Sequence, residues 1–450
     1  MTRITGRPII RITLAILVLA AVALGCGRAA SVDAPRALSA PGARAASGGS
    51  GTTPVIAEYR PGEVVWWPYN ASESDAVENE YGMTATASLA GGTLCSIPDG
   101  QDALTFSQQL QSDSRVSWAE PNYVAETAES RGHSFAFDDG HDFQSGYVDQ
   151  FAAQRLGLTS AHVASKGRGI LVAVIDTGID PEHPLLAGHL VTGHDFVDGD
   201  TDPRELPDGI DSDGDGEIDE ALGHGSHVAG IVALVAPEAK IMALRVLDND
   251  GRGDAFQIAR AIDYAVARHA NVINLSLGML NEDHMLRDAI TRARNAGAVV
   301  IASAGNWGAE NPEEFPAASP LVSAVAATGA DDLPTSFTSF GNYVALCAPG
   351  EGIRSAYWNG HTAVWSGTSM SAPFVSGGAA LLLAAHPGWT GAQVLDRLAL
   401  TATPLPSTLP EAGGNFGAGV LNLAAALAPD PPGDAGTPDA PIEKAAPTRP

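Results

Sequence analysis

The chain has 450 residues, which is enough for more than one domain and for a large buried core. Its formal net charge is −27, and so acidic a chain repels phosphate backbones, which argues against nucleic acid as a partner. The 50 glycines and 30 prolines indicate many tight turns and loops.

The first 26 residues have the pattern of a bacterial secretory signal. Arg3, Arg7 and Arg11 come before an apolar stretch over residues 12–25, which is too short for a comfortable membrane span. The sequence Ala-Leu-Gly-Cys that ends at Cys26 resembles a lipoprotein signal, in which the cysteine is lipidated. We therefore expect export from the cytoplasm, as a cell-envelope lipoprotein anchored through Cys26 or, alternatively, as a secreted protein after ordinary cleavage.

Composition divides the rest of the chain into five parts. Residues 27–54 are rich in Ala, Gly, Ser and Pro and predict a low-complexity linker, and residues 429–450 predict a disordered tail. Residues 55–126 open and close with strand-like stretches and predict a small α+β domain. Residues 127–150 are polar and glycine-rich and suit a cleavable connector, and residues 151–428 form the main domain.

The main domain alternates apolar runs with helical patterns. Residues 254–270 and 283–297 show helical spacing, and residues 371–386 predict a buried central helix rather than a membrane span. Alternation of strands and helices predicts an α/β fold with a mostly parallel sheet, whose functional residues gather at the carboxyl ends of strands. Five runs are apolar throughout and predict strands buried on both faces: residues 170–176, 240–247, 271–278, 298–306 and 321–328.

Three glycine-containing segments in this domain carry an Asp, a His and a Ser in that order. They are VAVIDTGID around Asp176, GHGSHVAG around His224 and SGTSMSAP around Ser369. A hydroxyl nucleophile needs a neighbouring base, and the base needs a carboxylate to fix its tautomer. The simpler alternatives each lack a part: no second DTG or DSG is present for an aspartic protease, and His224 and His227 lack the glutamate of a zinc-protease motif.

At these segments the chain resembles the subtilisin-like serine protease family over residues 146–428. The resemblance implies a three-layer α/β fold in which Ser369 attacks a peptide carbonyl, His224 acts as base and then acid, and Asp176 orients the histidine. It further implies that Asn306, in SAGNWG, donates to the oxyanion. By the same resemblance, Ser276, Leu277 and Gly278 pair with the substrate backbone, and Trp307 borders the primary specificity pocket.

An acidic run precedes His224. Twelve acidic residues and one base, Arg204, lie between Asp195 and Glu220. Within this run, Asp211, Asp213 and Asp215 place oxygen donors at alternate positions, as in the first half of an EF-hand loop. Leu222, however, stands at the position of the bidentate glutamate. The run resembles calcium loops inserted before the histidine of many bacterial subtilases, which predicts a structural Ca²⁺; a solvated acidic turn is the alternative. The predicted ligands are Asp211, Asp213, Asp215 and Asp219.

The predicted function is an exported serine endopeptidase that cleaves proteins or peptides through an acyl-enzyme, without a catalytic cofactor. The stretch Glu120-Pro-Asn-Tyr123 resembles the end of a subtilase propeptide, which implies a precursor inhibited by its own N-terminal domain. Two alternatives remain open at this point: a catalytically idle peptide-binding surface protein, and a peptide ligase or macrocyclase on the same fold. The natural substrate and the bond cut during maturation are not predicted.

Overall fold

The computed structural model describes residues 58–132, 134, 136–140, 146–312, 314–406 and 416–429. All of them belong to the larger of two compact units, Ser39–Pro450. The predicted signal segment with Cys26, the linker 27–54 and residues 430–450 of the predicted tail lie outside the described residues.

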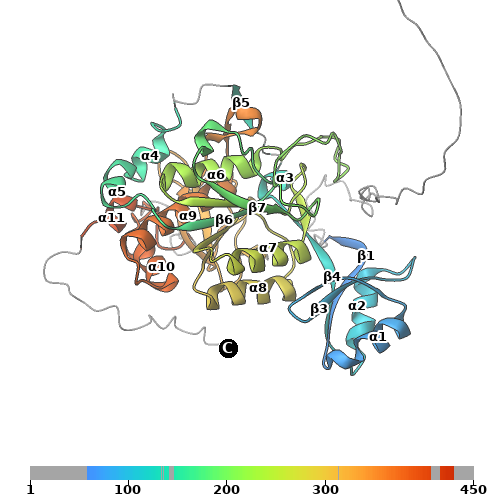
Figure 1. Cartoon of the computed structure of the whole chain (residues 1–450). Coiled ribbons are helices and arrows are strands. Elements are labelled where there is room, and N and C mark those ends of the chain that lie inside the picture. The colour runs from blue at the N-terminus through green and yellow to red at the C-terminus, as the bar shows by residue number, and fades with distance from the viewer. Residues whose placement is uncertain are drawn as a thin grey trace, which may run out of the picture. The chain divides into compact units, whose positions relative to one another are not determined.

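The centre of the fold is a seven-stranded sheet in which every neighbouring pair is parallel, in the order β13-β12-β11-β10-β6-β8-β7 (Figure 1). From β6 the chain crosses to the edge strand β7 and returns to β8, then crosses to β10 and continues outward through β11, β12 and β13, so the sheet is doubly wound. The five apolar runs are strands of this sheet, as predicted. The bounds are β6 (Leu171–Asp176), β7 (Leu190–Asp195), β8 (Lys240–Arg245), β10 (Val272–Leu275), β11 (Val299–Ser303), β12 (Ser323–Thr328) and β13 (Val344–Pro349).

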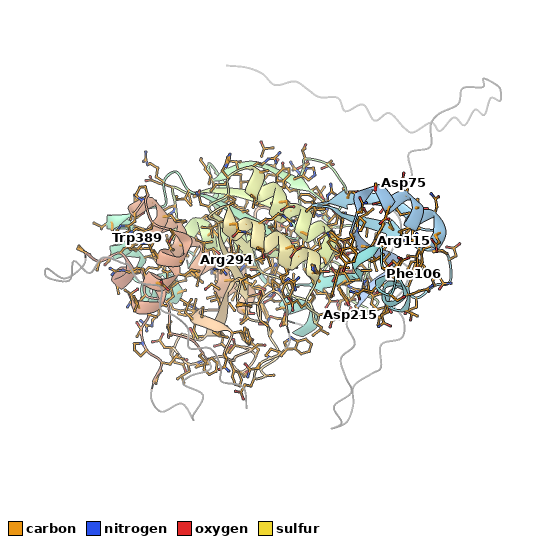
Figure 2. All side chains as sticks on the ribbon, turned by 90° about the horizontal axis from the view of Figure 1, so that it is seen from below. Asp75, Phe106, Arg115, Asp215, Arg294 and Trp389 are labelled. Atoms are coloured by element: carbon orange, nitrogen blue, oxygen red, sulfur yellow. The ribbon has the colours of Figure 1, made fainter. Side chains whose placement is uncertain are left out.

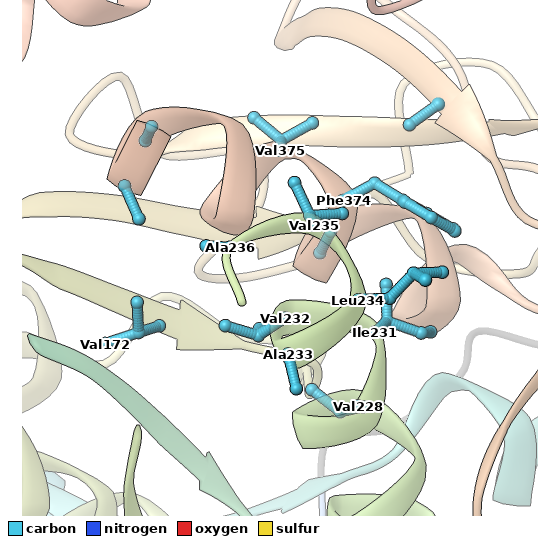
Figure 3. Packing of buried hydrophobic residues seen from close by; sticks show 14 of the residues in the cluster. Val172, Val228, Ile231, Val232, Ala233, Leu234, Val235, Ala236, Phe374 and Val375 are labelled. Carbon is cyan, nitrogen blue, oxygen red and sulfur yellow. The ribbon is translucent and has the colours of Figure 1, made fainter. Parts of the chain in front are cut away.

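Side chains of β6 alternate between two cores, one on each face of the sheet. Val172 and Val174 pack with α6 (His224–Val235) and α9 (Thr368–Ala385), as the close view in Figure 3 shows for Val172. Ala173 and Ile175 pack with α7 (Ala255–Ala267) and α8 (His284–Asn295), which lie side by side in Figure 1. The period of two and burial on both faces explain why the strand is apolar throughout.

Helix α9 is the buried central helix that the sequence predicts. It is the one described helix long and apolar enough to cross a membrane, but 83% of its most apolar window is buried inside the protein. Gly377 lets α6 approach closely, because a Cβ there would lie 2.5 Å from the Cβ of Val235. The helix is therefore a core element that packs closely against the end of α6.

Smaller elements complete this part of the chain. Strand β5 (Phe137–Gly140) adds to the hairpin β14 (Ile353–Ala356) and β15 (Thr362–Trp365). Part of the predicted connector 127–150 is thus paired structure. The remaining helices are α3 (Ala128–Gly132), α4 (Phe151–Arg155), α5 (Leu158–Ala164), α10 (Gly391–Leu400) and α11 (Leu423–Ala426), with short 3₁₀ turns at Pro184–Leu186 and Trp358–Gly360.

Residues 59–126 form an antiparallel sheet and two helices around a separate core. The sheet order is β2-β3-β1-β4-β9, and Trp66 and Phe106 are buried between sheet and helices; Phe106 is labelled in Figure 2. This is the small α+β arrangement that the sequence predicts for residues 55–126. Its elements are β1 (Tyr59–Pro68), a 3₁₀ turn (Ala71–Glu73), α1 (Ser74–Tyr81), β2 (Thr84–Leu89), β3 (Gly92–Ser96), α2 (Ala103–Gln111) and β4 (Val116–Glu126), joined by β9 (Arg252–Asp254) of the main domain.

Candidate active site

Asp176, His224 and Ser369 meet at the carboxyl edge of the sheet, and all three are fully buried. Asp176 is the last residue of β6, His224 is the first residue of α6, and Ser369 is the second residue of α9. His224 Nδ1 lies 2.6 Å from Asp176 Oδ1. The packing of α6 against α9 brings base and nucleophile together, although 145 residues separate them in the sequence.

Asn306 points its amide nitrogen into this site. Its Oδ1 accepts hydrogen bonds from the backbone N–H of Thr368 (3.0 Å) and from the Thr368 hydroxyl (2.9 Å). With the oxygen held in this way, Nδ2 faces the site and donates to a carboxylate oxygen of Glu129 at 3.0 Å. The orientation suits an oxyanion donor, because a side-chain amide then points at the position where negative charge develops.

Glu129 is a residue of the site that the sequence did not reveal. Its carboxylate contacts the Ser369 hydroxyl (2.6 Å), His224 Nε2 (3.2 Å) and Asn306 Nδ2 (3.0 Å), and its side chain is 1% exposed. Gly367 leaves the space for it, because a Cβ there would come within 1.7 Å of a Glu129 oxygen. Glu129 lies in the segment predicted as a connector, in TAESRG, where no motif or spacing distinguishes it from a solvated acid.

The two carboxylates around His224 change its protonation. Burial disfavours the imidazolium, but Asp176 and Glu129 together outweigh burial and raise the pKa of His224 to about 10. Burial also works against the Glu129 carboxylate, yet the hydrogen bonds and charge of its partners, His224 first, lower its pKa. His224 is thus held as an imidazolium between two carboxylates and cannot accept the Ser369 proton in this arrangement.

The chain segment before Glu129 lies between two strand edges of the main domain. On one edge, Glu126 exchanges two backbone hydrogen bonds of 2.9 Å with Gly278. On the other edge, the end of β4 pairs antiparallel with β9, and Thr127 N–H donates to Gly251 O, just before β9, at 3.0 Å. This is the geometry of an extended peptide added to a sheet edge. The sequence predicts substrate pairing at Gly278, but it does not predict the pairing along β9.

The other predicted substrate-binding residues lie close to Gly278 and Ser369. Ser276 donates from its hydroxyl to Ser369 O at 3.0 Å, and Leu277 is buried. Trp307 is 38% exposed, and its indole N–H donates to Glu314 at 2.9 Å. The Glu314 carboxylate fills the space beside Gly278, where an added Cβ would lie 2.2 Å from it. A larger residue at this edge position would have to displace the Glu314 side chain.

Three of the four predicted calcium ligands lie together. Carboxylate oxygens of Asp211, Asp213 and Asp215 all lie within 4.8 Å of one another, and Asp215 is labelled in Figure 2. Asp219 stays outside this group, because its carboxylate accepts the backbone N–H groups of Asp208 and Gly209.

The chemistry of this acidic group fits a hard divalent cation. Glu220 faces the group, and one of its oxygens is buried with no hydrogen-bond partner among the described residues. Burial, and then the charges of Asp215, Asp213, Asp250 and Asp211, raise the pKa of Glu220 to about 8. A Ca²⁺ ion prefers oxygen ligands and would relieve this repulsion.

Comparison with known proteins identifies the family. The model of the subtilase family (peptidase S8) matches residues 167–419. Subtilisin NAT from Bacillus subtilis subsp. natto is 37% identical over 331 residues, which cover 71% of this chain and 77% of that protein. Thermitase from Thermoactinomyces vulgaris is 38% identical over 269 residues, which cover 58% of this chain and 90% of that protein.

A solved structure agrees with these relatives. The crystal structure of fervidolysin from Fervidobacterium pennivorans, a keratinolytic enzyme related to subtilisin, matches with a TM-score of 0.67 and 25% identity over 83% of this chain. The present chain spans 62% of the length of that one. The sheet order, the buried Asp–His–Ser group and these matches lead to one conclusion: the chain belongs to the subtilase family and is a subtilisin-like serine protease, a hydrolase of peptide bonds.

Proposed function

We propose that this protein is an exported serine endopeptidase, made as a precursor that its own N-terminal domain keeps inactive. The observation that carries the proposal is Glu129, whose carboxylate contacts nucleophile, base and amide donor at once. The chain before it lies along both strand edges, in the manner of a bound peptide. The structure is therefore read as the precursor, with its substrate groove filled by the chain itself.

In the mature enzyme, Ser369 Oγ attacks the carbonyl carbon of the scissile peptide. His224 takes the hydroxyl proton and passes it to the leaving amine, while Asp176 holds the imidazole in the required tautomer. Asn306 Nδ2 donates to the oxyanion, and the N-terminus of α9 adds its positive end. Water then attacks the acyl-enzyme, with His224 again as base.

The N-terminal domain docks on the free N-termini of two helices. The Glu120 carboxylate accepts the backbone N–H of His284 (3.1 Å) and of Met285 (3.2 Å) at the start of α8. Asn122 Oδ1 accepts the N–H of Phe256 at the start of α7. Both side chains accept hydrogen bonds from N–H groups in the first turn of a helix, which have no partner within the helix. These contacts support residues 55–126 as an intramolecular inhibitor.

The primary test compares the full chain with the variant Ser369→Ala. We expect the wild type to cut itself between the two domains, to hydrolyse unfolded protein and to react with a fluorophosphonate probe at Ser369. The variant should stay uncut and unreactive. N-terminal sequencing of the products reports the maturation site. A correctly processed wild type that neither reacts nor hydrolyses would reject the endopeptidase and support an idle peptide-binding protein, and joined peptides in the product mixture would indicate a ligase.

The role of Glu129 is tested with Glu129→Gln. Loss of the charge removes one of the two carboxylates that hold His224 protonated, so the uncut precursor should label with the probe faster than the wild type precursor. The matched control is Glu126→Gln, since Glu126 is a neighbouring buried acid that pairs with Arg252 at 3.3 Å instead of with the triad. Equal labelling of all three precursors would show that Glu129 does not restrain the site.

We also propose that Asp211, Asp213 and Asp215 hold a structural Ca²⁺, with Glu220 available as a further oxygen ligand. The proposal is supported by the clustering of their oxygens and by the raised pKa of Glu220. Export rests on the N-terminal signal pattern, and anchoring rests on Cys26. Mass spectrometry of the mature N-terminus separates a diacylated Cys26 from a free downstream amine, which would refute the anchor.

A further inference from the structure

Glu205 is a buried acid that links the two loops of the Asp–His pair. Its side chain belongs to the segment after β7, and that segment is fixed beside the loop that follows Asp176: Ile179 N–H donates to Pro203 O, and Glu205 N–H donates to Ile179 O. Glu205 is 2% exposed. Nothing in the chemistry described above uses this carboxyl group, although burying an idle acid is costly.

The contacts of Glu205 reach both loops. Its Oε1 lies 2.5 Å from the Thr177 hydroxyl and 3.1 Å from Gly225 N, and its Oε2 accepts from the Ser226 hydroxyl at 2.5 Å. Thr177 directly follows Asp176, and Gly225 and Ser226 directly follow His224. A single carboxyl group thus connects the residue after the orienting acid to the residues after the base.

Hydrogen counting shows how Glu205 reaches Asp176. Thr177 Oγ1 has one hydrogen and two lone pairs. It accepts from Gly225 N–H at 2.9 Å, and it lies 2.5 Å from Glu205 Oε1 and 3.3 Å from Asp176 Oδ1. An ionised Glu205 would take the Thr177 hydrogen for itself. A neutral Glu205 donates to Thr177 Oγ1 instead, which leaves the Thr177 hydrogen for Asp176.

The surroundings favour the neutral acid. Burial raises the pKa of the Glu205 carboxyl, and the negative charge of Asp176 raises it further, against hydrogen bonds from Ser226 and Thr177 and the charge of His224. The nearby Arg245 directs its charge elsewhere, with one nitrogen 2.9 Å from Asp195 and 2.8 Å from Asp198. Asp176 Oδ1 lies 2.6 Å from His224 Nδ1 and accepts the backbone N–H of Thr177 at 2.8 Å, and the Thr177 hydroxyl at 3.3 Å adds a third contact to the same oxygen.

We propose that Glu205 is a positioning residue that acts as a neutral carboxylic acid: it donates to the Thr177 hydroxyl, which in turn donates to Asp176 Oδ1. The chain of hydrogen bonds holds the Asp176 carboxylate in the orientation that His224 requires, and the bonds to Gly225 and Ser226 fix the start of α6 against it. This inference rests on the proposed function, since it concerns the same triad.

The test uses the mature enzyme, with concentrations set by fluorophosphonate titration so that misfolded protein is not counted. Glu205→Ala and Thr177→Val should each lower kcat roughly tenfold with little change in KM, as expected when an outer hydrogen-bond partner is lost. Glu205→Gln should recover most of the lost kcat, because its amide is a neutral donor of the same shape. The double variant Glu205→Ala/Thr177→Val should be no slower than the slower single variant, because both act through one path.

Three results would overturn the inference. A Glu205→Gln enzyme as slow as Glu205→Ala would mean that the charge is needed. Additive losses in the double variant would mean that the effect does not pass through Thr177. A Glu205→Ala enzyme with wild-type kcat and a lower unfolding temperature would mean a purely structural role. Asp283→Asn is the control for that case, since Asp283 is a buried acid that caps α8 and does not contact the triad.

A second readout separates this inference from the proposed function. In full-length Ser369→Ala protein, which needs no activity, the proton between His224 Nδ1 and Asp176 gives a downfield NMR signal. Glu205→Ala should shift that signal, whereas Glu205→Gln and Asp283→Asn should leave it in place. An unmoved signal in Glu205→Ala would refute the positioning role even if the wild type proves an active protease, and a wild type without activity would refute the proposed function alone.

Discussion

At the scale of single residues, the site is defined by how each polar group is held. Asn306 projects Nδ2 because Thr368 occupies its oxygen with two donors. His224 is oriented by Asp176 and, in this state, also bound by Glu129. The Ser226 hydroxyl accepts Asp180 N–H and donates to Glu205. In this structure one carboxylate, that of Glu129, contacts both His224 and Ser369.

We expect Asn306→Ala to lower kcat by about 10²–10³ with a small change in KM, the range established on subtilisin itself for loss of one oxyanion donor. The reason is that Nδ2 is aimed at the developing charge, which exists in the transition state and not in the bound substrate. Steady-state kinetics on a peptide ester and on the corresponding amide measures the loss. An unchanged kcat would show that Asn306 does not donate to the oxyanion.

At the scale of elements, two helix N-termini and two strand edges receive the N-terminal domain. Strand β4 extends from the small sheet into the groove and pairs with β9, so one strand serves both as a core element of its own domain and as the ligand of the other. Glu120 and Asn122 in the same strand accept backbone N–H groups from the first turns of α8 and α7. Regular secondary structure thus positions the N-terminal domain and leads its chain to Glu129, beside His224 and Ser369.

Docking on α8 should depend on pH through Glu120. Burial raises the pKa of this carboxyl to about 7 in the docked state, against the hydrogen bonds that it accepts, whereas a free glutamate titrates near 4.3. The contribution to docking is therefore complete below about pH 4 and is lost as pH rises through about 7, which favours release of the cut domain at pH 8 over pH 5 by about 75-fold. Probe labelling of the self-cut protein across this pH range measures release.

The variant Glu120→Gln should flatten this pH dependence. The control is Asp113→Asn, because Asp113 pairs with Arg115 inside the N-terminal domain and does not contact α8. If release from Glu120→Gln still rises with pH as steeply as from the wild type, another group controls it.

At the scale of the whole molecule, charge is the dominant feature, with 52 acidic residues against 25 basic ones. Much of the excess is gathered in the loop before α6, where Asp211, Asp213 and Asp215 converge. Ser212 in the same loop donates to Asp248, which links the loop to the segment that leads into β9. A cation in this loop would therefore stabilise one edge of the substrate groove as well as the loop itself.

Removal of calcium should lower the unfolding temperature. A ligand present at about 100 times its Kd stabilises the folded state by about 2.7 kcal/mol, so chelation with EDTA should shift the thermal transition down by several degrees. Asp213→Asn should lower the transition in calcium and abolish the EDTA effect, whereas Asp263→Asn, a surface acid paired with Arg292, should keep it. Identical melting with and without EDTA, and no metal by elemental analysis, would refute the calcium site.

The sequence by itself determined the family and most of the sheet, and it predicted the residues of the candidate triad. Strands buried on both faces must be apolar throughout, and Asp176, His224, Asn306 and Ser369 each stand in a local motif, so short stretches carry the signal. Strand β7 was missed because an edge strand with Thr192, Gly193 and His194 has no such run. The tertiary structure alone decided that Glu129 meets the triad and that Glu205 joins its two loops, because contacts across 240 and 28 residues depend on the path of the whole chain and not on any local pattern.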